Sequence, residues 1–452
     1  MNGEKCFMII PTMKKRKRQG KQAIVTGSFG SRFSKLSDTR RSWIAVAGSL
    51  VVVALAIVVP VAVYRSMAST GSASVEPELG SITAPAASVT DSTASGGRNV
   101  QFGNGAACGG PITISTGGTY SGCYASTDIN TPAVKITTTA AVTINRATIH
   151  HAGVAITAPS GANLTLTNST VQATSVASAN QRVWEINSPV SVVVEHNNIF
   201  DGQGFWNGSG TPGTMRFRYN EVKNIGRYPH PATANCCVQF VQMDSVTSPG
   251  IEIAWNRITN TYGQSDVEDN VNMYKTSGTD SAHPIDIHHN LVDGAYPRSG
   301  DATNPNFTGG GLLLGDSGFG AHGIIHDNRV INTADYGVAI SGGQDNHLYN
   351  NRIVSDINAA GTTSPVMATW AQGIIVWDTH SLGNMTNDTA YNNVSALIRP
   401  DGRADWWLPN CTPLTACTGN VNGPTPTAAL EQAERDGWAA DLAAAGLTVG
   451  PN

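Results

Sequence analysis

Four short segments of this sequence place a lysine and two aspartates in one column. Aligned on their Gly or Asn, the segments put Lys275, Asp316, Gly342 and Asp378 at the same position; they read NVNMYK (270–275), GLLLGD (311–316), GVAISG (337–342) and GIIVWD (373–378). Neighbouring strands of a sheet lie about 4.8 Å apart. If these segments are neighbouring strands, we expect Lys275 and Asp316 to lie side by side.

Two more carboxylates, Glu268 and Asp269, come just before the first of these strands. A base beside several carboxylates fits β-elimination of a sugar chain that carries uronates. That reaction needs a base to remove the proton beside the uronate carboxylate and a cation to acidify it. The sequence predicts Lys275 as the base, with Asp316 and Asp269 in the catalytic group and Glu268, Asp269 and Asp316 as Ca²⁺ ligands. No other cofactor is predicted.

Two other interpretations of this column stay open. Hydrolysis uses two carboxyl groups, and a separation of two coils, roughly 9.6 Å, lies at the upper end of the range for inverting glycosidases. Alternatively, Lys275 and Asp316 form only a surface ion pair, worth at most about 1 kcal/mol.

Substrate contacts are predicted around this column. We expect Asp378, Arg298, Tyr296 and Trp377 to bind the sugar chain, because aromatic rings stack on sugar rings. The commoner use of such aromatics is to cover a core beneath long loops, and that alternative stays open.

The strands that position these residues belong to a repeat. Its full pattern has apolar residues at the first, third and eighth positions and Asn at the sixth, as in Ile251, Ile253, Asn256 and Ile258. Seven copies carry the Asn, at positions 197, 220, 256, 290, 328, 351 and, weakly, 392; two earlier copies have Ala147 and Ser169 at that place. The shortest spacing is 23 residues, which indicates stacked coils that cannot bury a core alone. We expect each Asn to stack on the next as an internal ladder.

The sequence divides into five parts. Residues 1–41 are basic, and residues 42–65 contain 22 uncharged, mainly apolar positions (43–64), enough to cross a bilayer. Residues 66–99 have the composition of a flexible linker. The solenoid is expected over 100–424, and an amphipathic helix that begins near Pro426 and stops at Gly446 over 425–452.

The charge asymmetry around 43–64 predicts a single-pass signal anchor. Basic residues precede the span and only Arg65 follows it closely, so the N-terminus is expected in the cytoplasm and the solenoid outside the cell membrane. The rival interpretation is a cleaved secretory signal, because Ser66, Met67 and Ala68 offer small residues for cleavage. The net charge of −4 combines this basic segment with an acidic remainder, so no nucleic-acid partner is expected.

Cysteine spacing predicts two disulfides in an exported domain. We expect Cys108 to pair with Cys123 and Cys411 with Cys417, because each pair is close in sequence. The adjacent Cys236 and Cys237 are not assigned, since a bond between neighbours is strained.

Several segments resemble one superfamily. GPITISTGGTYSG, SDVEDNVNMYKTSGT, GGGLLLGDSG and YGVAISGG resemble the pectate-lyase-like right-handed parallel β-helix proteins, over roughly residues 109–400. The resemblance implies an all-β, single-stranded right-handed parallel β-helix, to which the segments described above add an N-terminal transmembrane helix and a short C-terminal amphipathic helix. It also implies polysaccharide lyases, glycoside hydrolases or epimerases, with non-catalytic adhesins beside them. The motifs of polygalacturonase-like hydrolases and alginate epimerases are absent, so no catalytic residue is carried over.

Two function classes follow from these observations. The first is a membrane-anchored extracellular enzyme acting on a polysaccharide, a lyase or less readily a hydrolase. The second is a cell-surface protein that binds glycan or a neighbouring cell without catalysis. Loops of uneven length gathered between Asn220 and Asn328 favour the first, because sites are built from loops on a rigid scaffold.

The predicted topology can be tested on intact cells. Protease added from outside should remove the domain that follows Arg65 and leave residues 1–41 intact, because only the former is expected to be exposed. Immunoblotting with one tag at each end checks this. Full protection of the C-terminal tag, with complete digestion after the cells are permeabilised, would contradict the topology.

Overall fold

The computed structural model describes residues 108–174, 180–227, 238–296, 308–356, 358, 360–361, 367–402 and 406–452. It also describes the backbone of β1 (Ala87–Thr90) and β2 (Arg98–Gln101), which pair as antiparallel strands. This pair begins inside the segment predicted to be a linker. The predicted basic segment and membrane span lie outside the described residues. Within those residues, no helix is both long enough and apolar enough to cross a membrane.

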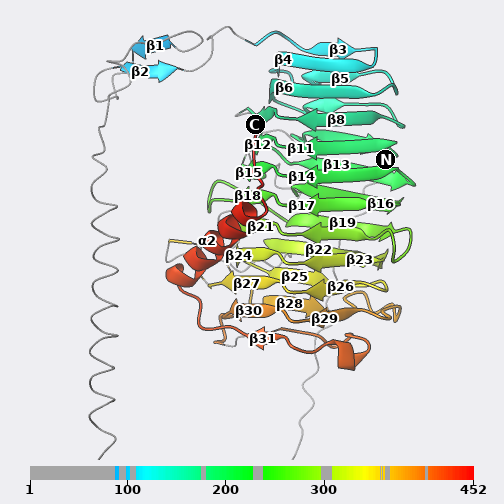
Figure 1. The fold of residues 1–452 in the computed structure, drawn as a ribbon, viewed down its shortest axis with the longest axis vertical. Helices are drawn as coiled ribbons and strands as arrows, with labels where there is room; N and C mark the ends of the chain where they lie inside the picture. Colours follow the sequence, from blue (N-terminus) through cyan, green and yellow to red (C-terminus); the bar gives the residue numbers. More distant parts are fainter. Residues whose placement is uncertain are drawn as a thin grey trace, which may run out of the picture. The chain divides into compact units, whose positions relative to one another are not determined.

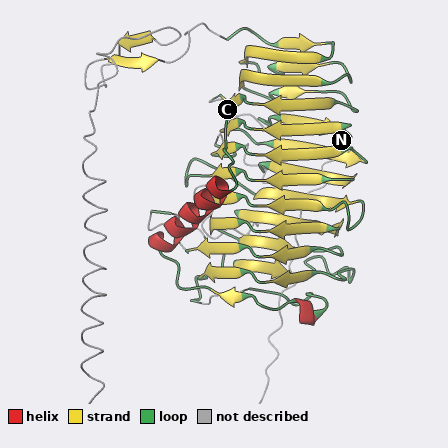
Figure 2. Ribbon diagram, in the orientation of Figure 1, coloured by secondary structure: helices red, strands yellow, loops and turns green. Residues whose placement is uncertain are grey.

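From β3 onward the chain winds into a parallel β-helix (Figure 1). A sheet of ten strands has the order β28-β25-β22-β19-β16-β13-β10-β7-β5-β3, and a second sheet holds 19 strands. In the central coils, one strand enters the first sheet and two enter the second, and successive coils pair in parallel. The ribbon in Figure 2 shows this stack of strands with a helix against its side. The strand order fits the right-handed parallel β-helix predicted from the sequence.

The strands have the following bounds. In the ten-stranded sheet they are β3 (Ile112–Ile114), β5 (Val134–Ile136), β7 (Ile156–Thr157), β10 (Trp184–Asn187), β13 (Phe205–Gly210), β16 (Val241–Ser248), β19 (Asp269–Gly278), β22 (Gly310–Ala321), β25 (Tyr336–Ile340) and β28 (Gln372–Val376). In the 19-stranded sheet they are β4 (Gly118–Ser126), β6 (Val142–His151), β8 (Asn163–Thr167), β9 (Thr170–Ala173), β11 (Ser191–Glu195), β12 (Asn198–Phe200), β14 (Thr214–Arg218), β15 (Glu221–Lys223), β17 (Ile251–Ala254), β18 (Arg257–Thr259), β20 (Ile285–His288), β21 (Leu291–Ala295), β23 (Gly323–His326), β24 (Arg329–Thr333), β26 (His347–Tyr349), β27 (Arg352–Ser355), β29 (Thr389–Tyr391), β30 (Val394–Leu397) and β31 (Val421–Asn422).

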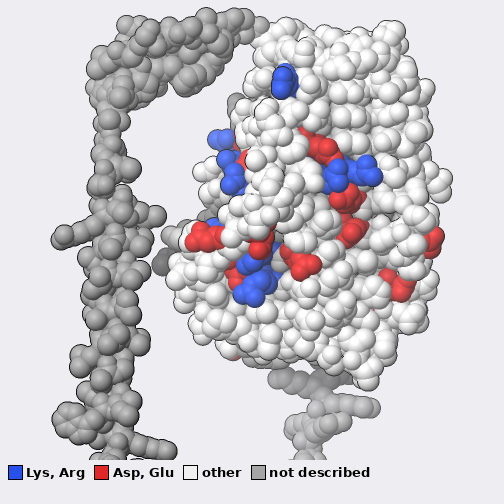
Figure 3. All heavy atoms as spheres, in the orientation of Figure 1, with Lys and Arg blue, Asp and Glu red and all other residues white. Residues whose placement is uncertain are grey.

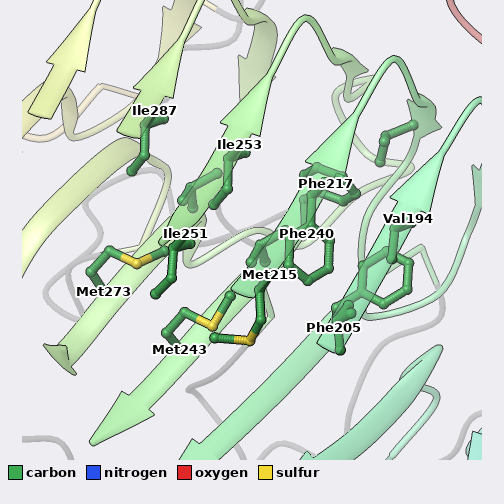
Figure 4. Packing of buried hydrophobic residues seen from close by; sticks show 14 of the residues in the cluster. Val194, Phe205, Met215, Phe217, Phe240, Met243, Ile251, Ile253, Met273 and Ile287 are labelled. Carbon is green, nitrogen blue, oxygen red and sulfur yellow. The ribbon is translucent and has the colours of Figure 1, made fainter. Parts of the chain in front are cut away.

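The core consists of apolar side chains stacked from coil to coil between the two sheets. Val194, Phe217, Ile253 and Ile287 occupy one register position of the 19-stranded sheet (Figure 4). All four are fully buried. Because alternate strand residues point inward, this stacking confirms the apolar alternation in the repeat.

The predicted asparagine ladder is present and runs along one corner of the 19-stranded sheet. In each rung, the side-chain Oδ1 of one Asn accepts hydrogen bonds from the backbone N and the Nδ2 of the Asn in the preceding coil. Asn290 accepts from Asn256 at 3.0 and 2.9 Å and donates to Asn328 Oδ1 at 3.0 Å. The rungs are Asn197, Asn220, Asn256, Asn290, Asn328, Asn351, Asn393 and Asn420.

The last rungs correct the sequence prediction. Asn393 carries the ladder, whereas Asn392, which the pattern proposed, takes a left-handed conformation with φ of 56° just before it. Asn420 adds a rung that the pattern did not find. At the other end, Ser169 replaces Asn, because its backbone N donates to Asn197 Oδ1 and its hydroxyl accepts from Ala147 N.

The C-terminal helix α2 (Ala428–Ala444) packs against the side of the solenoid, over β24 and β27. Its N-cap is Thr427, whose side chain accepts from Leu430 N, so the helix begins slightly later than predicted. Glu431, Glu434 and Trp438 form its buried face.

Ion pairs explain this acidic buried face. The Glu434 carboxylate accepts from Arg329 on β24 and from Arg352 on β27, and Arg435 pairs with Asp293 at 2.6 Å. Acidic and basic side chains accordingly lie side by side around α2 (Figure 3). A carboxylate that stays ionised when it is buried needs pairing of this kind.

Both predicted disulfides are present. Cys108 is bonded to Cys123 near the first coil, and Cys411 to Cys417 beside the short 3₁₀ helix η2 (Leu414–Ala416) near the last one. Cys236 and Cys237 lie outside the described residues.

Removal of one rung should destabilise the solenoid. Asn290→Ala would leave buried donors and acceptors of the neighbouring rungs without partners, at about 1–3 kcal/mol for each group. We expect a clear fall in the urea midpoint of unfolding, followed by circular dichroism. The control Asn187→Ala removes an exposed side chain and should change stability by less than about 0.5 kcal/mol. Equal effects of the two changes would contradict a stabilising ladder.

Candidate functional site

A bulge in β22 decides which side chains meet on the outer face of the ten-stranded sheet. Asn272 of β19 pairs with Leu313, but Tyr274 pairs with Asp316, so β22 carries one extra residue in between. Gly315 accommodates it, with φ of 69° and no room for a Cβ beside the carbonyl of Gly342. Bulges of this kind commonly use Gly in the left-handed region.

The bulge corrects the predicted column. Asp316 lies opposite Tyr274 and not opposite Lys275. Lys275 has a positive φ of 48°, and its Nζ lies 4.9 Å from the centre of the Tyr274 ring. The alignment on Gly or Asn assumed continuous strands, and one extra residue shifts the partner by one position.

Four side chains nevertheless gather where Asp269 and Asp316 were expected to meet. The Nδ2 of Asn272 donates to Asp269 Oδ2 at 2.7 Å and to Asp316 Oδ2 at 2.9 Å. The Tyr336 hydroxyl donates to Asp269 Oδ1, and the backbone N of Ser317 donates to Asp316 Oδ1 at 2.6 Å. Asp269, Asn272, Asp316 and Tyr336 are called the carboxyl cluster below.

The strands explain how these four residues meet. Asp269, Gly310 and Tyr336 occupy successive coils at the start of β19, β22 and β25, and a Cβ on Gly310 would lie 2.3 Å from Asp269 Oδ1. Gly310 therefore lets Tyr336 reach past one coil to Asp269. Asn272 points outward because its neighbours Val271 and Met273 belong to the core.

Burial raises the pKa values of both carboxyl groups in this cluster. Burial raises the pKa of Asp269 well above its ordinary value, and the negative charges of Glu268 and Asp316 raise it further. Burial also raises the pKa of Asp316, against the hydrogen bond from Asn272. Two close carboxyl groups with raised pKa values share protons instead of ionising together.

The members of the cluster differ in access. Asp269, Asn272 and Tyr336 are only 4%, 2% and 6% exposed, whereas Asp316 is partly exposed. Asp316 is therefore the member that an external molecule can reach, with Asp269 and Tyr336 behind it.

A row of polar and aromatic side chains leads to the cluster across successive coils. Trp206, Gln242 and Asn272 are register partners on the outer face. The guanidinium of Arg182 lies 5.9 Å from the Trp206 ring and donates to Gln242 at 3.4 Å. Trp206 is partly exposed, whereas Arg182, Gln242 and Asn272 are buried, so Trp206 is the stacking surface of this row.

Other predicted residues have different surroundings. Glu268 accepts from Gln239 at 2.6 Å, and its charge acts on Asp269, so it lies at the edge of the cluster. Asp378 is buried, and its carboxylate accepts from the backbone N of Leu382 and of Gly383 at 3.0 and 2.7 Å. Asp378 thus caps its own loop. Trp377 follows β28 directly and is partly exposed, with its backbone N donating to Ile340 O.

Burial removes Tyr296 from the predicted sugar contacts. Tyr296 is 2% exposed and packs edge to face against Tyr262 at 5.7 Å. Its ring belongs to a small cluster with Ala334 and Tyr262, so it is not available to stack on a sugar. Arg298 lies outside the described residues.

The predicted Ca²⁺ ligands do not stand out as a metal site in this geometry. Among the described residues, the groups of three potential ligands within 4.8 Å of one another do not include Glu268, Asp269 and Asp316 together. An amide nitrogen, which is a donor, joins Asp269 to Asp316 instead. A cation between these two carboxylates would require Asn272 to turn away.

Sequence reasoning missed Asn272, Tyr336, Arg182 and Gln242. Asn272 and Gln242 carried a usable signal, because each is a polar residue between two core residues of a buried strand. Tyr336 carried none, since its contact with Asp269 spans 67 residues of sequence.

A surface pocket lies elsewhere, on the 19-stranded sheet. It has a volume of about 240 Å³ and is lined by residues of β14, β17 and β20 and the turns before them, among them Arg216, Glu252, His283 and Asp286. It contains no residue of the carboxyl cluster. We place the candidate site at the carboxyl cluster, because catalysis depends on the reacting groups more than on the volume of a pocket.

Comparison with known proteins adds little to this picture. No family model matches the sequence, and no curated protein matches it. Among solved structures, the chain is similar to the PL6 family polysaccharide lyase Pedsa3628 from Pseudopedobacter saltans. The identity is 11% and the TM-score 0.25, over 71% of this chain and 89% of that chain. A likeness of this size carries no argument about activity.

A buried carboxyl beside the cluster provides a pH test of these surroundings. Burial raises the pKa of Asp335 to about 7, against the hydrogen bond from Trp370 Nε1 at 3.0 Å. Between pH 4 and 7 the unfolded chain ionises this group while the folded protein keeps its proton. The contribution of Asp335 to the free energy of unfolding therefore falls as the pH rises from 4 to 7. The fall is about 4 kcal/mol, because the folded and unfolded pKa values differ by about three units.

The variant Asp335→Asn should lose this dependence. Its free energy of unfolding, relative to wild type, should increase between pH 4 and pH 8 in urea titrations. Trp370→Phe removes the donor that lowers the pKa of Asp335 and should move the upper limit of this pH window to higher pH. A difference between wild type and Asp335→Asn that stays constant with pH would contradict the raised pKa.

Proposed function

We propose that this protein is a carbohydrate-active β-helix enzyme that cleaves a polysaccharide on the outer face of its ten-stranded sheet. One observation carries the proposal: Asp269 and Asp316 share the amide of Asn272 and both have raised pKa values. Paired carboxyl groups with shifted pKa values are a common arrangement for acid and base catalysis.

In this proposal Asp316 is the carboxyl that meets the substrate first, Asp269 is the second carboxyl of the pair, and Asn272 and Tyr336 position them. Asp316 is the partly exposed member. Asn272 holds its Oδ2, Ser317 holds its Oδ1, and Asp269 shares its proton equilibrium. Trp206 and Gln242 lie on the same side of the cluster and would contact sugar units there, along the row that crosses the coils.

Hydrolysis is the reaction that the cluster itself favours. The shared nitrogen limits the separation of the two Oδ2 atoms to about 5.6 Å. Carboxyl groups about 5–5.5 Å apart are typical of retaining glycosidases. The sequence suggested two carboxyl groups separated by two coils, a distance typical of inverting glycosidases. Asp269 and Asp316 lie closer together than that.

β-Elimination is the second candidate reaction. Lys275 directly follows Tyr274, the register partner of Asp316, and its Nζ would serve as the base. Glu268, Asp269 and Asp316 would then supply oxygen ligands for Ca²⁺, with Asn272 turned away. A uronate-containing polysaccharide would be the substrate in this case.

Glycan binding without catalysis is the alternative from another class. The near-complete burial of Asp269, Asn272 and Tyr336 favours it. Buried hydrogen-bonded groups of this kind can stabilise the fold without taking part in a reaction. For either class we propose an extracellular location on a cell-membrane anchor formed by residues 43–64.

The experiment uses the purified protein with a panel of polyuronates and neutral polysaccharides. Hydrolysis releases reducing ends alone, whereas elimination also produces unsaturated ends that absorb ultraviolet light. We expect wild type to cleave at least one glycan. Asp316→Asn should reduce turnover by about 10²–10⁴-fold, the usual contribution of an acid or base.

The control replaces an exposed carboxylate on α2 with the same amide. Asp436→Asn should retain full turnover and the wild-type melting temperature. Binding of a glycan without any cleavage would favour the non-catalytic alternative. Cleavage that survives Asp316→Asn in a folded protein would remove the carboxyl cluster from the mechanism.

A further inference from the structure

A second group of reactive side chains lies at the ladder corner of the 19-stranded sheet. It consists of His289, His326 and Asp327, which each offer one ligand atom, and these three atoms all lie within 4.8 Å of one another. The three side chains are partly exposed. The proposed polysaccharide chemistry uses none of them.

Two successive coils bring these residues together. β20 ends at His288 and β23 ends at His326, and these two histidines are register partners. His289 and Asp327 each follow directly, in left-handed conformations with φ of 53°. The ladder residues Asn290 and Asn328 come next, so the group sits on adjacent positions of two neighbouring coils.

The backbone beneath this group is held on several sides. Asn290 Nδ2 donates to His288 O at 3.0 Å, and Asn328 Nδ2 donates to His326 O at 2.9 Å. Trp438 of α2 donates to His289 O at 2.7 Å. A site on such a scaffold is preorganised, which limits the entropy lost when a ligand binds.

The rings are fixed as well. The His289 ring stacks on Trp255 at 4.3 Å between centroids, and the His326 ring stacks on Tyr349 at 4.8 Å. His326 Nε2 lies 2.9 Å from Asp286 Oδ1, and its Nδ1 lies 2.7 Å from Asp327 Oδ2. Without a metal both ring nitrogens donate, Nε2 to Asp286 and Nδ1 to Asp327. A metal ion would displace the Nδ1 proton and bind Nδ1 beside Asp327 Oδ2, while Nε2–H still donates to Asp286.

From this geometry we propose that His289, His326 and Asp327 bind one divalent transition-metal ion of the Zn²⁺ type, with Asp286 orienting His326 from behind. Two imidazoles and one carboxylate are ligands that suit Zn²⁺ and its neighbours, whereas Ca²⁺ prefers oxygen ligands alone. Three protein ligands leave a further coordination position for water or another small ligand.

Nearby features agree with access to this position. Asp286 also lines the pocket of about 240 Å³ on the same sheet, together with Glu252, which lies 3.7 Å from His288 Nε2. Among the described residues one other group has three potential ligands this close, Cys108, Cys123 and His150. Its cysteines are joined in a disulfide, so their sulfur atoms are not free thiolates.

The test is calorimetric titration of the full-length protein in detergent with Zn²⁺, after removal of any polyhistidine tag and of bound metal with a chelator. We expect one Zn²⁺ per chain and a rise in melting temperature, because binding to the folded state stabilises it. Co²⁺ in place of Zn²⁺ should give a visible absorption band from the same site.

Two ligand variants, one variant of the orienting Asp286 and one matched control decide the assignment. His289→Asn and Asp327→Asn keep a residue that tolerates the left-handed conformation, as Asn168 and Asn350 do at the same corner position. Each should weaken Zn²⁺ binding by at least about tenfold, and Asp286→Asn by about 10- to 100-fold. The control His196→Asn changes a histidine at the equivalent corner of another coil and should bind as wild type does.

Circular dichroism without metal establishes that each variant is folded, and the two ligand variants provide independent tests. Absence of Zn²⁺ binding to wild type would overturn the proposal. Equal affinity in the folded ligand variants and the His196→Asn control would also overturn it.

Discussion

The structure depends on one repeated hydrogen-bonding arrangement, in which the side chain of a buried Asn serves two neighbouring coils. Its Oδ1 accepts from the backbone N and the side chain of the preceding rung, and its Nδ2 donates to backbone carbonyls, as Asn256 and Asn290 show. Buried backbone groups at a sharp corner would otherwise lack partners, at a substantial cost in free energy. The ladder satisfies them and sets the spacing of the coils at the same time.

Because the ladder fixes the coils, the chain between its rungs is free to vary in length. Successive rungs are 23 residues apart at Asn197 and Asn220 and 42 apart at Asn351 and Asn393. The strands remain in parallel register across this variation, apart from local irregularities such as the bulge at Gly315. That bulge turns Asp316 toward Asn272 and Asp269 and creates a polar site on an otherwise regular sheet. A rigid scaffold with one local irregularity is a common basis for function.

The fold was predictable because its determinants are local. Alternating apolar residues and a following Asn recur within eight positions, so the pattern around Ile251 and Ile253 identifies both sheet and corner. The carboxyl cluster was predictable only in part. Asp269 and Asp316 were found from their types, but Lys275 was misplaced because a Gly-rich strand does not reveal its bulge. The Tyr336 hydroxyl bonds to Asp269 across the intervening coil. This contact is possible only because Gly310, which lies between them, has no side chain. The prediction that Tyr296 binds sugar was wrong because the burial of its ring depends on tertiary packing, which the local sequence does not reveal.

The C-terminal helix changes how the solenoid unfolds. A stack of coils with contacts only between neighbours tends to unravel from its ends, one coil at a time. Here α2 contacts β24 and β27, and the residues after it return toward earlier coils, where Gly450 donates to Tyr219 O and Asn452 to Asn168. These contacts close a loop of more than two hundred residues, as the separation of Asn452 from Asn168 shows. The middle coils and the chain end therefore stabilise one another, and loss of either exposes the other. The helix thus converts a linear series of coils into a more cooperative folding unit.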